Sequence, residues 1–127
     1  MKITDIQALG ANLGGGNHIY VKVMTDEHLI GYGEAYRAGP DMSVVAAVEY
    51  LKDWLVGEDP TRIEHLWRIM HNGSRFPGGS IVNAAISGIE TALGDIKGKA
   101  HGVPVYQLLG GRCRDKIRVY LGTGGGT

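Results

Sequence analysis

The stretch AISGIETALGDIKGK at residues 85–99 decides the fold, because it places many small residues among a few large apolar ones. The surrounding sequence predicts a helix from Ser80, as a possible N-cap, to about Ala100. Small side chains along a helix let another element approach its backbone. Gly88, Gly94 and Gly98 each lower helix stability by up to about 1 kcal/mol relative to alanine. We therefore expect close packing against this helix to offset that loss.

A short apolar turn and a strand-like run follow this helix. His101–Gly102 ends the helix, and Pro104 opens a single apolar turn that closes at Gly110–Gly111. The next run, Lys116–Leu121, alternates like a β-strand. We therefore predict a turn over residues 105–109 and a strand over residues 116–121.

Three further strands are predicted ahead of the helices. Residues 17–25 show the clearest alternation, in which Ile19, Val21 and Val23 alternate with Tyr20, Lys22 and Met24. Residues 3–11 alternate less regularly, and residues 29–35 form a third run. Because strands this close in sequence are usually antiparallel neighbours, we expect a three-stranded meander.

Two more helices are predicted between the strands and the small-residue helix. The first carries an apolar stripe at helical spacing, formed by Val44, Val48, Leu51 and Leu55. The second carries another, formed by Ile63, Leu66, Trp67 and Met70. Two starts remain open for the second helix, either Asp59 as N-cap before Pro60 or a capping box of Thr61 with Glu64. Strands and helices segregated along the chain indicate the α+β fold class.

The composition excludes several classes of partner. The 127 residues carry 13 Lys and Arg against 13 Asp and Glu, whereas nucleic-acid and anionic-membrane surfaces require a basic excess. No apolar run approaches the ~20 residues of a membrane span. The single cysteine, Cys113, fits a reducing compartment, and Asp5 interrupts the region where a signal peptide is apolar. We therefore expect a cytoplasmic protein with no nucleic-acid or membrane partner.

Residues 85–99, together with Pro104–Val105 and Leu108–Gly110, resemble the signature of the mandelate racemase/muconate lactonizing group of the enolase superfamily. The flanking sequence agrees at residues 31–35 (GYGEA), 57–60 (GEDP), 66–67 (LW), 78–79 (GG) and 114–120 (RDKIRVY). One departure is Gly94, where members of this group often carry tryptophan. The resemblance covers essentially the whole chain.

The resemblance implies two parts. Residues 1–113 would form an N-terminal capping domain, a three-stranded antiparallel meander followed by a three-helix bundle. Residues 114–127 would begin the first strand of a (β/α) barrel, a fold that needs about 250 residues. The barrel would then be missing from this sequence.

The resemblance also implies an activity for the complete enzyme. The family removes the proton α to the carboxylate of a sugar acid, and a divalent metal, usually Mg²⁺, stabilises the enediolate. Dehydration or racemisation follows, and dehydration is favoured here by likeness to acid-sugar dehydratases. The metal ligands and bases would lie beyond Thr127, so we expect no catalytic residue and no turnover from residues 1–127 alone.

Two loops of the capping domain would cover the substrate, by the same resemblance, and they correspond to residues 12–18 and 36–42. The substrate-binding candidates are His18, Tyr36 and Arg37 in these loops and Thr123 at the end of the expected barrel strand. The Arg37 guanidinium offers directed donors for a carboxylate or hydroxyls, while His18 and Tyr36 would cover the sugar. For each residue, a solvated loop position without function remains the alternative.

The Lys97-Gly98-Lys99 segment resembles the Lys-x-Lys base motif of the family, but it falls on the predicted helix. We therefore interpret both lysines as surface residues. Lys99 stands four residues after Asp95, a spacing at which the two side chains pair on a helix.

A second hypothesis is a non-catalytic module that binds a ligand or assembles on its own. Such a module would leave the predicted strand at residues 116–121 without a neighbour, and exposed apolar strands associate. Under either hypothesis we expect a homo-oligomer.

Overall fold

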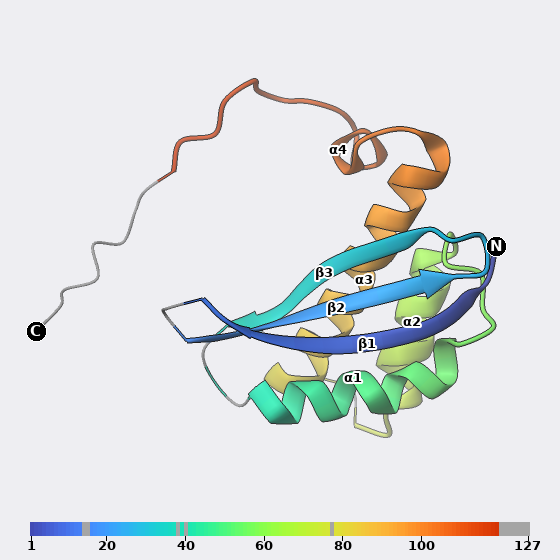
Figure 1. The fold of residues 1–127 in the computed structure, drawn as a ribbon, viewed down its shortest axis with the longest axis vertical. Coiled ribbons are helices and arrows are strands. Elements are labelled where there is room, and N and C mark those ends of the chain that lie inside the picture. Colours follow the sequence, from blue (N-terminus) through green and yellow to red (C-terminus); the bar gives the residue numbers. More distant parts are fainter. Residues whose placement is uncertain (14–15, 38, 40, 77, 120–127) are drawn as a thin grey trace, which may run out of the picture.

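The structure, a computed structural model, describes residues 1–13, 16–37, 39, 41–76 and 78–119. Within them the elements follow one another in the order β1 (Ile3–Asn12), β2 (Asn17–Thr25), β3 (Ile30–Arg37), α1 (Asp41–Leu55), α2 (Ile63–Gly73), α3 (Ser80–His101) and α4 (Val105–Leu108) (Figure 1). This order confirms the α+β class. None of the helices in the described ranges combines the length and the apolar character needed to cross a bilayer.

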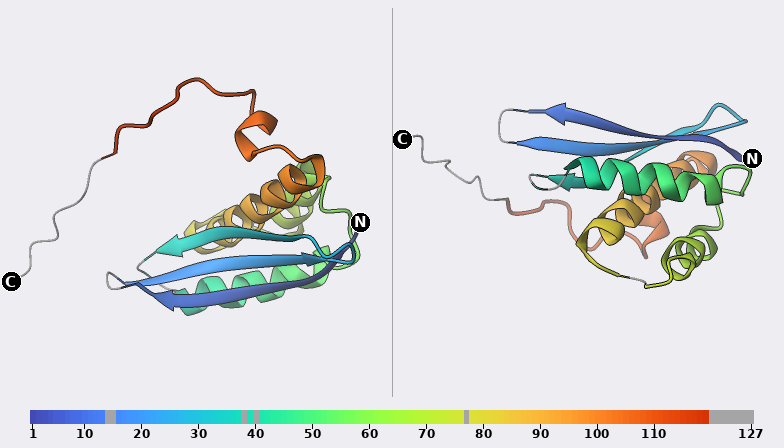
Figure 2. Two further views of the ribbon diagram at one scale, coloured as in Figure 1. Left: turned by 45° about the horizontal axis from the view of Figure 1, so that its top comes forward. Right: turned by 90° about the horizontal axis from the view of Figure 1, so that it is seen from below.

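The three strands form one antiparallel sheet in the order β1-β2-β3, which confirms the meander. The helices lie on one face of this sheet (Figure 2). Ile19, Val21 and Val23 of β2 point to that face and are at most 2% exposed. A sheet covered on one side produces the alternation seen in the sequence.

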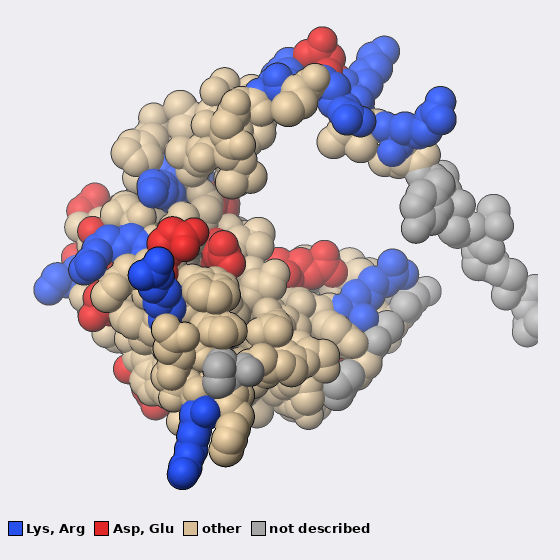
Figure 3. All heavy atoms as spheres, turned by 180° about the vertical axis from the view of Figure 1, so that it is seen from behind, with Lys and Arg blue, Asp and Glu red and all other residues tan. Residues whose placement is uncertain are grey.

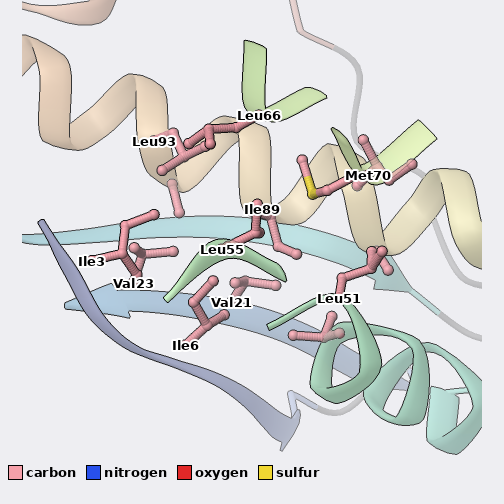
Figure 4. Close-up of a cluster of buried hydrophobic side chains, with 14 of the residues drawn as sticks. Ile3, Ile6, Val21, Val23, Leu51, Leu55, Leu66, Met70, Ile89 and Leu93 are labelled. Carbon is pink, nitrogen blue, oxygen red and sulfur yellow. The ribbon is translucent and has the colours of Figure 1, made fainter. Parts of the chain in front are cut away.

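The core lies between the sheet and helices α1 and α3, with α2 packed against α3. Figure 4 shows apolar side chains from all of these elements meeting there, among them Ile6, Val21, Leu55, Met70, Ile89 and Leu93. Each of these side chains is completely buried. Burial of one such side chain contributes roughly 1.5–3 kcal/mol to folding.

Strand β3 lies directly against the backbone of α3, because both are built from small residues at their contact. A Cβ at Gly33 would stand 2.1 Å from the Gly88 carbonyl oxygen, and one at Gly31 would stand 2.1 Å from that of Ala92. A Cβ at Gly88 would stand 2.7 Å from the Cβ of Ala35. The expected close packing is therefore confirmed at Gly88, where the partner is a strand, but not at Gly94, where the nearest atom to an added Cβ would lie 4.0 Å away.

The predicted starts of two helices are wrong. The N-cap of α2 is Arg62. The Asp59 carboxylate instead accepts hydrogen bonds from the Thr61 backbone N–H at 2.9 Å and hydroxyl at 2.8 Å, which closes a turn ahead of the helix. Ser80 is the first residue of α3, and its N-cap is Gly79, whose φ of 83° favours glycine.

The chain after α3 confirms one prediction and corrects another. The apolar turn forms α4, but residues 116–119 are not a strand, and residues 120–121 of that prediction lie outside the described part. Ile117 and Val119 are 77% exposed. A strand needs hydrogen bonds from a neighbour, and among the described residues β1, β2 and β3 pair only with one another. Figure 3 shows basic side chains along this extended segment, which carries Arg112, Arg114, Lys116 and Arg118.

Candidate functional site

Three described segments meet at the end of the sheet away from the N-terminus. They are the start of β2, the end of β3 and the start of α1 (Figures 1 and 2). His18 lies in β2, and Tyr36 and Arg37 lie in β3, so all three belong to strands and not to the loops expected from the sequence. The register pairs His18 with Arg37, whereas Tyr36 packs on the core side. Thr123, the fourth substrate-binding candidate, lies outside the described residues.

His18 is held on the sheet face that the helices do not cover. Its Nδ1 lies 2.8 Å from Oε1 of Glu34, and its ring stacks on that of Tyr20 with centroids 6.1 Å apart. The His18 side chain is only 15% exposed, against 48% for Glu34. A carboxylate accepts hydrogen bonds, so Glu34 favours the tautomer with a proton on Nδ1. The Nε2 atom is then left for a second partner.

Tyr36 and Arg37 point to opposite faces of β3. Tyr36 pairs with Ile19 in the register and packs partly buried against the core. Arg37 pairs with His18 across the sheet and is exposed. Within the described residues, the Arg37 guanidinium makes no hydrogen bond or ion pair. Arg37 therefore remains available to an anionic or hydroxyl-bearing ligand beside His18.

A hydrogen bond connects the start of β2 to the start of α1. The Asn17 side-chain Nδ2 donates to Oδ2 of Asp41 at 2.5 Å. The other oxygen of Asp41 accepts from the Met42 backbone N–H at 2.9 Å. The hydrogen bond from Asn17 contributes most to holding the pKa of Asp41 below its usual value, and the bond from Met42 adds to it. Asp41 therefore holds the Asn17 side chain from the start of α1.

The sequence reasoning missed Glu34, Asn17 and Asp41 as site residues. Asn17 and Asp41 both fall in the two loop ranges, and Glu34 lies in the GYGEA motif, so each was inside a region already singled out. Their pairing was not visible because the partners are 16 and 24 residues apart in the chain.

The described residues do not provide a metal site. They contain no group of three or more His, Cys, Asp or Glu side chains placed to hold a cation. The expected Asp95–Lys99 pair forms, with Lys99 Nζ 2.7 Å from Asp95 Oδ2, and the same Nζ lies 2.7 Å from the Ile30 carbonyl oxygen. Lys99 therefore ties α3 to the edge of β3.

A groove of about 1100 Å³ lies elsewhere, between α3, the start of α2 and α4. Its walls include Gly94, Asp95 and Leu108. It contains none of the candidate residues, so the loop end of the sheet and this groove are separate features.

Comparison with known families identifies the domain type. The family model "Mandelate racemase / muconate lactonizing enzyme, N-terminal domain" matches residues 11–110. The D-galactonate dehydratase of Pectobacterium atrosepticum is 50% identical over 107 residues, which cover 84% of this chain and 28% of that protein. The D-galactonate dehydratase of Xanthomonas campestris is 46% identical over 125 residues, 98% of this chain and 32% of that protein. The chain thus spans less than a third of the length of these relatives.

Solved structures agree with the fold. An enolase from Pantoea ananatis with bound D-gluconate and Mg is 42% identical, with a TM-score of 0.86, over 90% of this chain and 28% of that one. An enolase from Agrobacterium radiobacter, bound to Na and L-malate, is 40% identical, with a TM-score of 0.89, over 94% of this chain and 30% of that one.

Proposed function

The chain belongs to the mandelate racemase / muconate lactonizing enzyme N-terminal domain family, and we propose that it is the substrate-capping domain of a Mg²⁺-dependent sugar-acid dehydratase. The observation that carries the proposal is the exposed Arg37 beside His18, at the sheet end where both candidate loops begin or end. The dehydratase names of relatives about half identical in sequence support the reaction type.

Sugar-acid dehydration removes the proton α to the carboxylate and expels the β-hydroxyl as water. In the full-length enzyme, Mg²⁺ would stabilise the negative charge that develops on the carboxylate oxygens. The residues described in this chain offer no cluster of metal ligands, so their part is to bind and orient the substrate.

The described side chains supply donors and acceptors suited to a polyhydroxy acid. The Arg37 guanidinium donates in a fork that matches a carboxylate or two neighbouring hydroxyls. His18, oriented by Glu34, presents Nε2 as an acceptor for a hydroxyl. Tyr36 remains a candidate contact, with its half-buried side chain on the core side of β3, opposite Arg37. Thr123 remains a candidate contact from the expected first barrel strand, and the boundary between residues 113 and 114 remains a proposal.

The function is tested by the Arg37→Met variant in the full-length protein that carries this chain. Loss of a charge-assisted hydrogen bond worth roughly 1.5–3 kcal/mol should raise KM for the sugar acid by about ten- to a hundredfold. Turnover of D-galactonate and D-gluconate with Mg²⁺ is the measurement. The matched control is Arg68→Met, an equal change at an exposed position of α2.

Two results would contradict the proposal. One is a full-length protein that dehydrates neither acid. The other is an equal KM for Arg37→Met and Arg68→Met, since the exposed guanidinium at the sheet end would then have no part in binding.

A stand-alone assembly module is the second candidate, and the exposed Ile117 and Val119 favour it. Apolar side chains on an extended segment without a neighbour associate with other chains. We expect the 127-residue chain to form dimers or larger species in light scattering after size exclusion. Ile117→Lys/Val119→Lys should return it to a monomer. A wild-type chain that stays monomeric at high concentration would exclude this candidate.

A further inference from the structure

We propose that the Asn17–Asp41 hydrogen bond is a positioning link that holds the start of β2 to the start of α1, so that His18 and Arg37 meet the sugar acid together. This inference rests on the proposed function of the loops. Asn17 and Asp41 are positioning residues, since they act through His18 and Arg37.

The Asn17–Asp41 link lies close in the chain to both His18 and Arg37, so it can affect the position of each. His18 and Arg37 form the last pair in the register between β2 and β3. Asn17 precedes His18, and Asp41 opens α1 four residues after Arg37. No further β2–β3 pair follows His18 and Arg37 in the described residues. The Asn17–Asp41 bond therefore connects the start of β2 to the start of α1 just beyond this last pair.

Both oxygens of Asp41 are used, which fixes the direction of the carboxylate. Oδ2 accepts from Asn17 and Oδ1 accepts from the Met42 backbone N–H. A carboxylate that accepts hydrogen bonds at both oxygens cannot rotate freely, so Asp41 also fixes the orientation of the Asn17 amide. Glu34 anchors the His18 ring from the neighbouring strand. His18 is thereby fixed through its ring and through the residue before it.

An exchange of the two side chains tests the link in the full-length protein. Asn17→Asp alone places two carboxylates together, and we expect KM for the sugar acid to rise about tenfold or more. Asp41→Asn alone weakens a charge-assisted bond, and we expect a rise of about three- to tenfold. The double variant Asn17→Asp/Asp41→Asn rebuilds an amide–carboxylate bond with its direction reversed, so KM should return to within about twofold of wild type. In each variant kcat should change less than KM, because positioning acts on binding.

The matched control is Asp53→Asn, the same change at an exposed position of α1. Circular dichroism of every variant checks that the fold is retained. Single variants with wild-type KM would overturn the proposal, as would a double variant no better than the worse single. If Arg37→Met raises KM while the single variants do not, the link is wrong and the capping function stands. If Arg37→Met also leaves KM unchanged, both proposals fail.

Discussion

A Gly33→Ala variant is expected to lose about 3 kcal/mol or more of folding stability, although it adds a single methyl group. The new Cβ would stand 2.1 Å from the Gly88 carbonyl oxygen and 2.9 Å from the Ala92 backbone nitrogen. Both are backbone atoms of α3, so they cannot move aside as a flexible side chain would. Relief requires strand β3 to separate from α3, which opens the contact along its length. Urea unfolding of the 127-residue chain, followed by circular dichroism, measures the loss.

Gly94→Ala is the matched control, because it makes the same chemical change in α3 at a position that β3 does not contact. The nearest atom to its new Cβ would be Val105 Cγ1 at 4.0 Å, an open position. Alanine favours a helix over glycine by up to about 1 kcal/mol, so this variant should be slightly more stable than wild type. Equal destabilisation by both changes would show that the β3–α3 contact is not as close as described.

The sequence predicted the presence of this contact but not its partner. Glycine and alanine in α3 indicated that something approaches the helix. That β3 is the partner depends on Gly31 and Gly33, whose small size matters only once the strand crosses the helix. Residues 116–119 show the opposite error. Their alternation is a local property, whereas a strand requires a neighbour, and residues 116–119 have none in the described structure.

The candidate site, too, was only partly predictable, because its contacts depend on residues that are distant in sequence. The two loop ranges and the residues His18, Tyr36 and Arg37 follow from resemblance to a family. The register then placed His18 opposite Arg37, which alternation alone does not determine. Glu34 and Asp41 gain their roles from partners distant in sequence. Polar residues of this kind look like ordinary solvated positions until the sheet brings their partners beside them.

Leu93→Ala is expected to destabilise the chain by about 2–5 kcal/mol. The Leu93 side chain is completely buried in the core between α3 and the surrounding elements (Figure 4). Its removal leaves a cavity among neighbours that are themselves fully buried, such as Leu66 and Ile89, so the loss includes a cavity cost as well as the lost burial. The control is Leu109→Ala, the same truncation at a side chain that is 80% exposed, where we expect a change within about 0.5 kcal/mol. Chemical denaturation of both variants gives the two values. Similar losses at Leu93 and Leu109 would mean that α3 does not form the centre of the core.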